Sequence, residues 1–600
     1  MPHINAGKTK PDYDVVIVGS GAAGGQTAYT LAMEGVRVLM LEAGRNYDPV
    51  TETPMFNSLE QAPLRASGTT DKPFGFYDAT VDGGWEIPGE PYTQASKNSE
   101  DSFMWWRARM LGGRTNHWGR ISLRNGPYDF KPRSRDGLGF DWPIDYEDVA
   151  PYYDKVESLI GVFGSNEGLE NTPNSPEGVL LPPPKMRANE LLLHKAGKKL
   201  GIPVIPTHRA VLSQRLNSKR IPKWLHPNNP SAQRILAEQM DQRLACFWST
   251  YCTRGCSIKA NYQSTTVHLP PALATGNLDI ITNAMAREVE VDRHGKATGV
   301  RFIDKTTGLD YSVKGRLVVL AASACESVRI LLNSQSALFP DGLANSSGLV
   351  GKYLMETVGA NLSGQVPALE NMPAHNQDGA GGGHVYVPWW QYQEQAAGRL
   401  DFPRGYHIET GYNNRMPSIA AMNELGNWIQ GTYGRKLKEE ARRYYGSFVA
   451  LRGRGEMVPN EDSFCELDPV VKDRWGIPVL KFHWKWGESE LRQAVHMQQT
   501  FAEVVSEMGG TVTTEIDATG KTAIYRPGRA IHEVGGAIMG SDPRRSVTNQ
   551  YSRTWDVPNL FITDGAPFCS NADKNPTLTI MALAWRTADF MMAEMKKGNV

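Results

Sequence analysis

Apolar and glycine-rich stretches follow one another near the start of the chain in a recognisable order. The apolar run Asp14–Val18 predicts a buried strand, Ala22–Met33 a helix and Val36–Leu41 a second strand. Three glycines stand between the first strand and the helix at the spacing of a phosphate-binding turn: Gly19, Gly21 and Gly24. This strand–turn–helix–strand unit predicts that a dinucleotide binds at the start of the chain.

Each residue type in this unit has a physical task. Gly19 permits the tight turn, Gly21 lets the backbone approach a pyrophosphate, and Gly24 lets the helix pack close to the sheet. The helix N-terminus at Ala22 and Ala23 offers free N–H groups and a partial positive charge to the diphosphate. About 20 residues beyond the turn, Glu42 can accept from ribose hydroxyls. The run through Ala43 to Gly44 resembles flavoproteins and therefore favours FAD over NAD.

The pattern of apolar and polar residues changes along the chain. It predicts an α/β fold, α+β overall, with two domains. Residues 1–360 and 527–600 form a Rossmann-like cofactor domain assembled from discontinuous segments, with a turn-rich lid at 45–102 and a cysteine-containing segment at 240–260. Short alternating runs in 361–526 predict a substrate domain, a mostly antiparallel sheet flanked by helices.

Composition narrows the class of protein. Six hundred residues exceed one hydrophobic core, and a net charge of zero argues against nucleic acid as the main partner. The sequence contains no run of about 18 apolar residues, so we expect no membrane span. Because Met1–Pro11 is polar, we expect a bacterial-type soluble protein, cytoplasmic for lack of a signal or periplasmic if exported with a small partner subunit.

Two C-terminal stretches carry a family resemblance, Ile531–Pro543 and Leu560–Ile580. They resemble the His-containing glycine-rich segment and the Asp-Gly loop of the glucose–methanol–choline (GMC) family of FAD-dependent oxidoreductases. The resemblance extends along nearly the whole chain, is weakest in 361–526, and is nearest to the sugar or glycoside dehydrogenase and pyranose oxidase branches. Val328 stands where the family usually has proline.

The resemblance implies roles for individual residues. His532 would be the catalytic base and Asn575 its partner, while Val289 would contact adenine through its backbone and Glu42 the adenosine ribose. The remaining residues expected to bind FAD are Gly113, Asn116, His117, Ala322, Asp564, Gly565, Pro576 and Thr577.

The chemistry fits these roles independently. Oxidising an alcohol by hydride transfer requires removal of the hydroxyl proton, which a group titrating near neutrality, such as His532, does best. Asn575 can donate to the substrate oxygen without competing for its proton. The helix that starts near Thr577 can direct its positive N-terminus towards the end of the flavin where reduction builds negative charge.

His117 lies in a Thr-Asn-His-Trp run similar to the segment that carries a covalently bonded flavin in the pyranose-oxidase branch. Three readings stay open: His117 bonds covalently to FAD, donates or accepts a hydrogen bond at the ring, or packs in the core.

Three of the six cysteines, Cys246, Cys252 and Cys256, fall within eleven residues. Their spacing resembles the cluster-binding segment of bacterial FAD-dependent glucose dehydrogenases, so an iron–sulfur cluster is one hypothesis, and zinc with a fourth ligand is another. Buried thiols or a single disulfide are the structural alternatives.

Aromatic residues are frequent in 361–526, and sugars stack their C–H faces on such rings, although we expect more than half of these rings to be core. Together these features predict FAD-dependent oxidation of a sugar or glycoside hydroxyl to a keto sugar or lactone. The electrons would pass to an external acceptor, a quinone, dye or cytochrome. An oxidase that makes hydrogen peroxide from oxygen, and a non-redox lyase of the same fold, are the alternatives.

Overall fold

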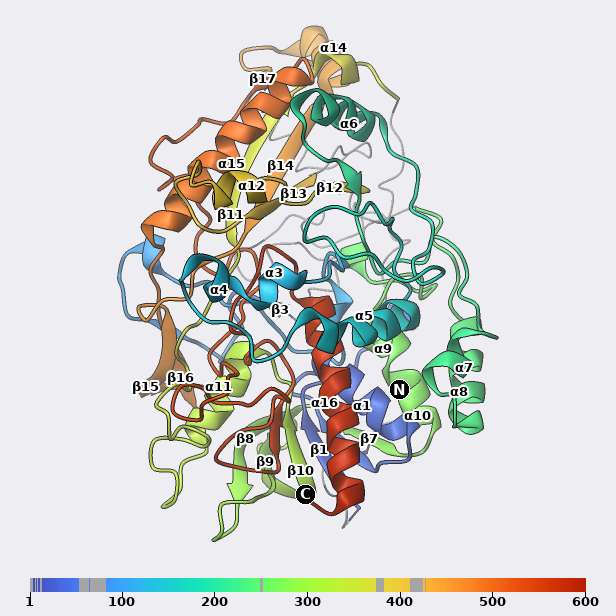
Figure 1. Ribbon diagram of the computed structural model, residues 1–600, viewed down its shortest axis with the longest axis vertical. Coiled ribbons are helices and arrows are strands. Elements are labelled where there is room, and N and C mark those ends of the chain that lie inside the picture. The colour runs from blue at the N-terminus through green and yellow to red at the C-terminus, as the bar shows by residue number, and fades with distance from the viewer. Residues whose placement is uncertain are drawn as a thin grey trace.

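We describe a computed structural model of the chain. It covers residues 13–52, 83–248, 252–373, 383–410 and 428–599, with the single positions 4, 5, 7, 9, 10, 64, 69, 425 and 426. Figure 1 shows an elongated molecule with one sheet in its lower half and another in its upper half. Among the described residues, no helix is long and apolar enough to cross a membrane.

The lower sheet has seven strands in the order β7-β2-β1-β10-β9-β8, with β18 beside β10. The parallel strands are β1 (Tyr13–Val18), β2 (Val38–Leu41), β7 (Leu278–Ile281), the second half of β10 (Asp310–Leu320) and β18 (Leu560–Ile562). β8 (Ala284–Val291) and β9 (Ala297–Asp304) extend it in antiparallel fashion. The near-continuous apolar runs of the parallel strands are fully buried, as strands covered on both faces require.

Helices from distant parts of the chain cover this sheet. α1 (Ala22–Met33) packs against α16 (Thr577–Lys597), which in turn packs against α5 (Tyr146–Ile160) (Figure 1). α9 (Ser264–Val267) and α10 (Leu269–Ala274) also contact α1, and α11 (Ala324–Asn333) packs against β8. The predicted Rossmann-like fold built from separated segments is confirmed.

The upper sheet is antiparallel and has the order β17-β11-β14-β13-β12-β6. Its strands are β17 (Thr511–Val512), β11 (Val358–Gln365), β14 (Phe448–Gly455), β13 (Tyr406–Thr410), β12 (Val385–Val387) and β6 (Ile205–Pro206). α15 (Glu488–Glu507) crosses one face, and α6 (Ala188–Leu200) packs on α15. A Cβ at Gly453 would lie 2.3 Å from Met497 Sδ, so glycine on this face allows the helix to approach.

Two features differ from a simple division at residues 361 and 526. β6 lies far earlier in the chain yet joins the upper sheet, and the hairpin β15 (Phe464–Lys472) and β16 (Pro478–His483) packs beside α11 of the lower half. Part of the expected lid, 83–102, is described, and β4 (Thr93–Gln94) within it pairs with β16. The domain boundaries and the lid stay predictions.

The remaining short elements connect these layers. They are α2 (Pro49–Glu52), β3 (Gly83–Gly84), η5 (Ser99–Asp101), β5 (Arg107–Ala108), η6 (Gly113–Asn116), α3 (Pro127–Phe130), α4 (Pro132–Asp136), α7 (Ile221–Leu225), α8 (Pro230–Asp241), η7 (Cys252–Arg254), η8 (Pro367–Leu369), α12 (Tyr392–Ala396) and α14 (Gly434–Tyr444).

Candidate active site

The glycine turn after β1 is sterically obligatory. A Cβ at Gly19 would lie 2.3 Å from the carbonyl oxygen of Ala321, and one at Gly24 would lie 2.0 Å from the carbonyl oxygen of Gly19. At Gly21 a Cβ would meet no described atom within 4 Å. Within residues 13–52, no side chain caps α1 at Gly21 and its first turn, with Ala22 and Ala23, holds no acidic residue. The turn therefore leaves backbone N–H groups and a positive helix end for an anion.

A second glycine segment lies directly against this turn. The N–H of Gly112 donates to Ser20 Oγ at 2.8 Å, and a Cβ at Gly113 would lie 3.7 Å from Gly21 Cα. Glu42 is buried and accepts from the N–H groups of Ser20 and Gly44, at 3.2 and 2.7 Å. Beside it, the carbonyl of Ala43 accepts from Lys305 Nζ at 3.0 Å.

The other predicted cofactor residues line the ends of β8, β10 and β18. Asp564 accepts from the N–H groups of Ser323 and Ala566, at 3.2 and 2.9 Å, and burial raises its pKa to about 6. Ala322 donates to Ser327 Oγ, and Gly565 packs against Val534. Val289 donates its N–H to Ser334 Oγ at 2.8 Å, so its proposed adenine contact would have to use its other backbone groups.

These residues fit a bound FAD. An uncapped helix N-terminus, a glycine whose Cβ position is open, and a buried acid past the second strand match the needs of a dinucleotide diphosphate and ribose. The described residues 13–44, 112–117 and 564–577 would hold it.

His532 and Asn575 meet, as the sequence predicts for a catalytic pair. His532 Nε2 lies 3.3 Å from Asn575 Nδ2, and its Nδ1 lies 3.0 Å from Thr357 Oγ1. An amide nitrogen can only donate, so Nε2 accepts, and the ring proton sits on Nδ1 and is donated to Thr357. Burial and the nearby Arg454 lower the pKa of His532 to about 3. The ring is therefore neutral and Nε2 keeps the lone pair that a base requires, but the expectation that His532 titrates near neutrality is wrong, because burial disfavours its charged form.

A buried carboxyl group supports the backbone of His532. Glu356 accepts from the His532 N–H at 3.0 Å, and burial together with the neighbouring charge of Glu533 raises the pKa of Glu356 to about 8. Glu533 pairs with Arg114 at 2.6 Å, which links the segment 112–117 to the residue next to His532.

The face of the upper sheet opposite α15 carries three charged or titratable side chains that were not predicted from the sequence. His407 on β13 lies directly across from Arg454 on β14, and Glu409 is two residues further along β13 on the same face. Glu409 accepts from Asn575 Nδ2 at 3.2 Å and lies 3.4 Å from Arg454 Nε. Polar and apolar residues alternate in Tyr406–Thr410, which indicates a strand with His407 and Glu409 on one face, although the alternation does not tell that this face lies at the site.

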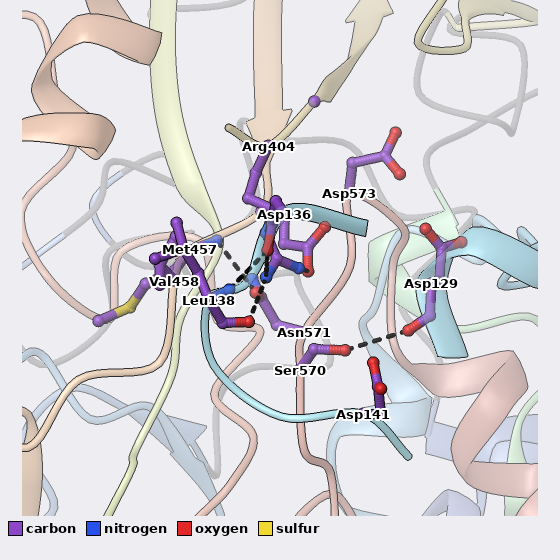
Figure 2. Close-up of polar contacts among 12 residues, drawn as sticks. Asp129, Asp136, Leu138, Asp141, Arg404, Met457, Val458, Ser570, Asn571 and Asp573 are labelled. Carbon is purple, nitrogen blue, oxygen red and sulfur yellow. Dashed lines mark hydrogen bonds and ion pairs between the residues drawn. The ribbon is translucent and has the colours of Figure 1, made fainter. Parts of the chain in front are cut away.

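The loop that carries Asn575 is anchored on both sides. Figure 2 shows Ser570 Oγ donating to the carbonyl of Asp129 at 3.2 Å and Met457 donating its N–H to Asn571 at 3.1 Å. Lys574 pairs with Asp129 at 3.0 Å and with Asp573. Asn571, Asp573 and Lys574 therefore anchor the loop that presents Asn575. Pro576 and Thr577 follow directly and begin α16.

His117 is buried beside the same segment. Its Nε2 accepts from Trp106 Nε1 at 3.0 Å, whereas its Nδ1 is buried and has no hydrogen-bond partner among the described residues. Burial lowers its pKa to about 3, so the ring is neutral. Asn116 donates to the carbonyl of Leu111, at 2.9 Å, and holds the turn before it. Covalent attachment of FAD at His117 stays a prediction.

The cysteine-rich segment does not form a described metal site. Cys252 and Cys256 are buried free thiols, and Cys246 is partly buried. Within the ranges given above, which omit residues 249–251, no group of three His, Cys, Asp or Glu side chains is placed to hold a metal ion. The iron–sulfur and zinc hypotheses therefore find no support.

Two family models match, both described as GMC oxidoreductase: the N-terminal model over residues 232–366 and the C-terminal model over residues 459–584.

Full-length relatives agree with these matches. The chain is 29% identical to a 2-methyl-1,2-propanediol dehydrogenase of Mycolicibacterium austroafricanum, over 96% of this chain and 95% of that protein. It is also 29% identical to the fructose dehydrogenase large subunit of Gluconobacter japonicus, over 98% of each. A pyridoxine 4-oxidase from Mesorbium loti has the same fold, with a TM-score of 0.62, 15% identity and coverage of 97% and 99%.

Proposed function

Because this chain belongs to the GMC oxidoreductase family, we propose that it uses bound FAD to oxidise a hydroxyl-bearing carbon of a sugar, glycoside or related polyol. The family models and the relatives confirm the predicted family and an oxidoreductase that acts on CH–OH groups. The observation that carries the proposal is the neutral His532, whose Nε2 lies 3.3 Å from Asn575 Nδ2.

His532, Thr357 and Asn575 have separate roles in the proposed reaction. His532 Nε2 takes the hydroxyl proton as the carbon–hydrogen bond breaks, and Thr357 fixes the tautomer by accepting from Nδ1. Asn575 donates to Nε2 before substrate binds and is held in place by Glu409. FAD, when bound, supplies the acceptor for the hydride.

The relatives support a polyhydroxylated substrate, since their names refer to a propanediol and to fructose. They include a subunit of a larger enzyme, which supports an external electron acceptor and a partner subunit for this chain as well. A cytochrome, quinone or dye would then accept the electrons, with oxygen as the alternative acceptor.

The test is anaerobic bleaching of the flavin by a panel of sugars, glycosides and polyols. We expect at least one compound to bleach the FAD, and His532→Ala to slow bleaching by roughly 10²–10⁴-fold with the flavin still bound. A panel that leaves the flavin oxidised throughout would instead favour a non-redox lyase. Peroxide formation measured against dye reduction in air then separates oxidase from dehydrogenase.

A further inference from the structure

Beside the proposed base lies a charged pair that the reaction itself does not require. Glu409 Oε2 and Arg454 Nε are 3.4 Å apart, and their side chains are only 14% and 13% exposed. The pKa of Glu409 is held well below its usual value, chiefly because Arg454 is close, so the carboxylate is ionised. Burying such a pair is costly unless its remaining donors and acceptors are used.

Several of those donors and acceptors are unused. Nε and Nη1 of Arg454 and Oδ1 of Asn575 are buried and have no hydrogen-bond partner among the described residues. Asn575 is oriented by Glu409, because a carboxylate only accepts and must face the amide nitrogen. The two Arg454 donors and the Asn575 acceptor therefore belong to side chains that are linked to His532 Nε2 through Asn575 and Glu409.

A hydroxyl group matches this arrangement. It donates one hydrogen bond and accepts others, so it can bridge Arg454 and Glu409 or Arg454 and Asn575 Oδ1. A carboxylate would be repelled by Glu409 and an ammonium group by Arg454, whereas the pair together carries no net charge. Arg454 lies over the Tyr525 ring, 5.7 Å from guanidinium carbon to ring centroid, and this contact helps to hold the guanidinium in place.

We propose that Glu409 and Arg454 form a second hydroxyl-binding subsite, which selects neutral substrates with a hydroxyl on the carbon next to the one oxidised. The two hydroxyl oxygens of such a 1,2-diol lie about one hydrogen-bond length apart. One would contact His532 Nε2 and the other the Glu409–Arg454 pair. This inference rests on the proposed function.

The first experiment compares diols with their monohydroxy analogues on the wild-type holoenzyme. Propane-1,2-diol, butane-2,3-diol and cyclohexane-1,2-diol are set against 2-propanol, 2-butanol and cyclohexanol in anaerobic flavin bleaching. We expect each diol to exceed its partner at least tenfold in second-order rate constant, since hydrogen bonds to charged groups are the stronger kind. Equal rates for diols and monohydroxy alcohols overturn the subsite but leave the proposed function standing.

The second experiment removes the carboxylate. Glu409→Ala removes the hold on Asn575 and should slow both alcohol classes, but the loss with the diols should exceed the loss with the monohydroxy alcohols by roughly tenfold or more. Glu409→Gln, which keeps the volume and a carbonyl acceptor, should lose less and guards against a folding defect. Glu439→Ala, in an exposed pair with Arg435 at 2.7 Å on α14, is the matched control and should change neither rate.

A loss of equal size with both alcohol classes would mean that Glu409 only positions Asn575, and would overturn the subsite. If no diol or sugar bleaches the wild-type flavin, the proposed function fails before the subsite is reached. The ratio of flavin to protein absorbance, measured for every variant, identifies those that have lost FAD.

Discussion

Lowering the pH from 7.5 to 5.0 should leave the oxidation rate almost unchanged, although the proposed base is a histidine. The pKa of His532 is lowered to about 3, mainly by burial and by Arg454. At pH 5 a histidine with an ordinary pKa of about 6.5 would be roughly 97% protonated, whereas one with a pKa of about 3 would be roughly 1% protonated. The expected loss in kcat/KM at pH 5 is therefore about 1%, against about thirtyfold for an unperturbed base.

An alkaline limb should appear instead. Glu356 is neutral below its pKa of about 8 and ionises as the pH rises through that value, which places a negative charge beside His532 and Glu533. That charge opposes the negative charge that a reduced flavin acquires, so the rate should fall above pH 8. Glu356→Gln should remove this limb and leave the plateau.

The measurement is stopped-flow flavin bleaching under anaerobic conditions between pH 5 and 9. Enzyme returned from pH 5 to pH 7.5 must regain its full rate, which separates protonation from acid inactivation. An acid limb of unit slope with a midpoint between 6 and 7 would refute the assignment of a buried, neutral His532.

Three further predictions concern residues around the base. Thr357→Val removes the acceptor for His532 Nδ1 and should lower kcat/KM roughly fivefold to tenfold, because the ring proton is then no longer held on Nδ1. Thr357→Ser keeps the hydroxyl and should keep the rate near wild type in pre-steady-state flavin bleaching. Gly24→Ala should destabilise the protein by about 1–3 kcal/mol and release FAD, as the thermal unfolding midpoint and the flavin absorbance would show. Gly119→Ala is the control and should do neither, because a Cβ there meets no described atom within 4 Å. Lys574→Met should cost about 3–5 kcal/mol in urea unfolding by leaving Asp129 and Asp573 unpaired, and Asp129→Asn in the same chain should recover part of that loss.

Much of the cofactor-binding half of the fold could be predicted from local sequence patterns. β1, the glycine turn and α1 follow from apolar runs and from glycines whose Cβ atoms would collide with the backbone, and α16 begins at Thr577, where the sequence predicts it. His532 and Asn575 came from a family resemblance, and the structure brings them within 3.3 Å.

The charged half of the site was not predictable in the same way. Whether Glu409 and Arg454 face each other depends on the register of β13 against β14, which pairs His407 with Arg454 and is fixed by packing rather than by local sequence. The anchoring of residues 571–574 was not predictable for the same reason, because Asp129 and Met457 lie more than 100 positions away in sequence.

The strand order of the lower sheet has a consequence for synthesis on the ribosome. β1 and β2 emerge first, but β10 follows about 270 residues later and β18 about 240 residues after that. At roughly 5–20 residues per second, the first strands wait on the order of half a minute to two minutes for the sheet to be completed. During that interval an apolar edge is exposed to chaperones and to neighbouring chains. Because α16 comes last and covers α1, FAD loading is expected to follow release of the full chain, and nascent-chain profiling would show chaperone occupancy until then.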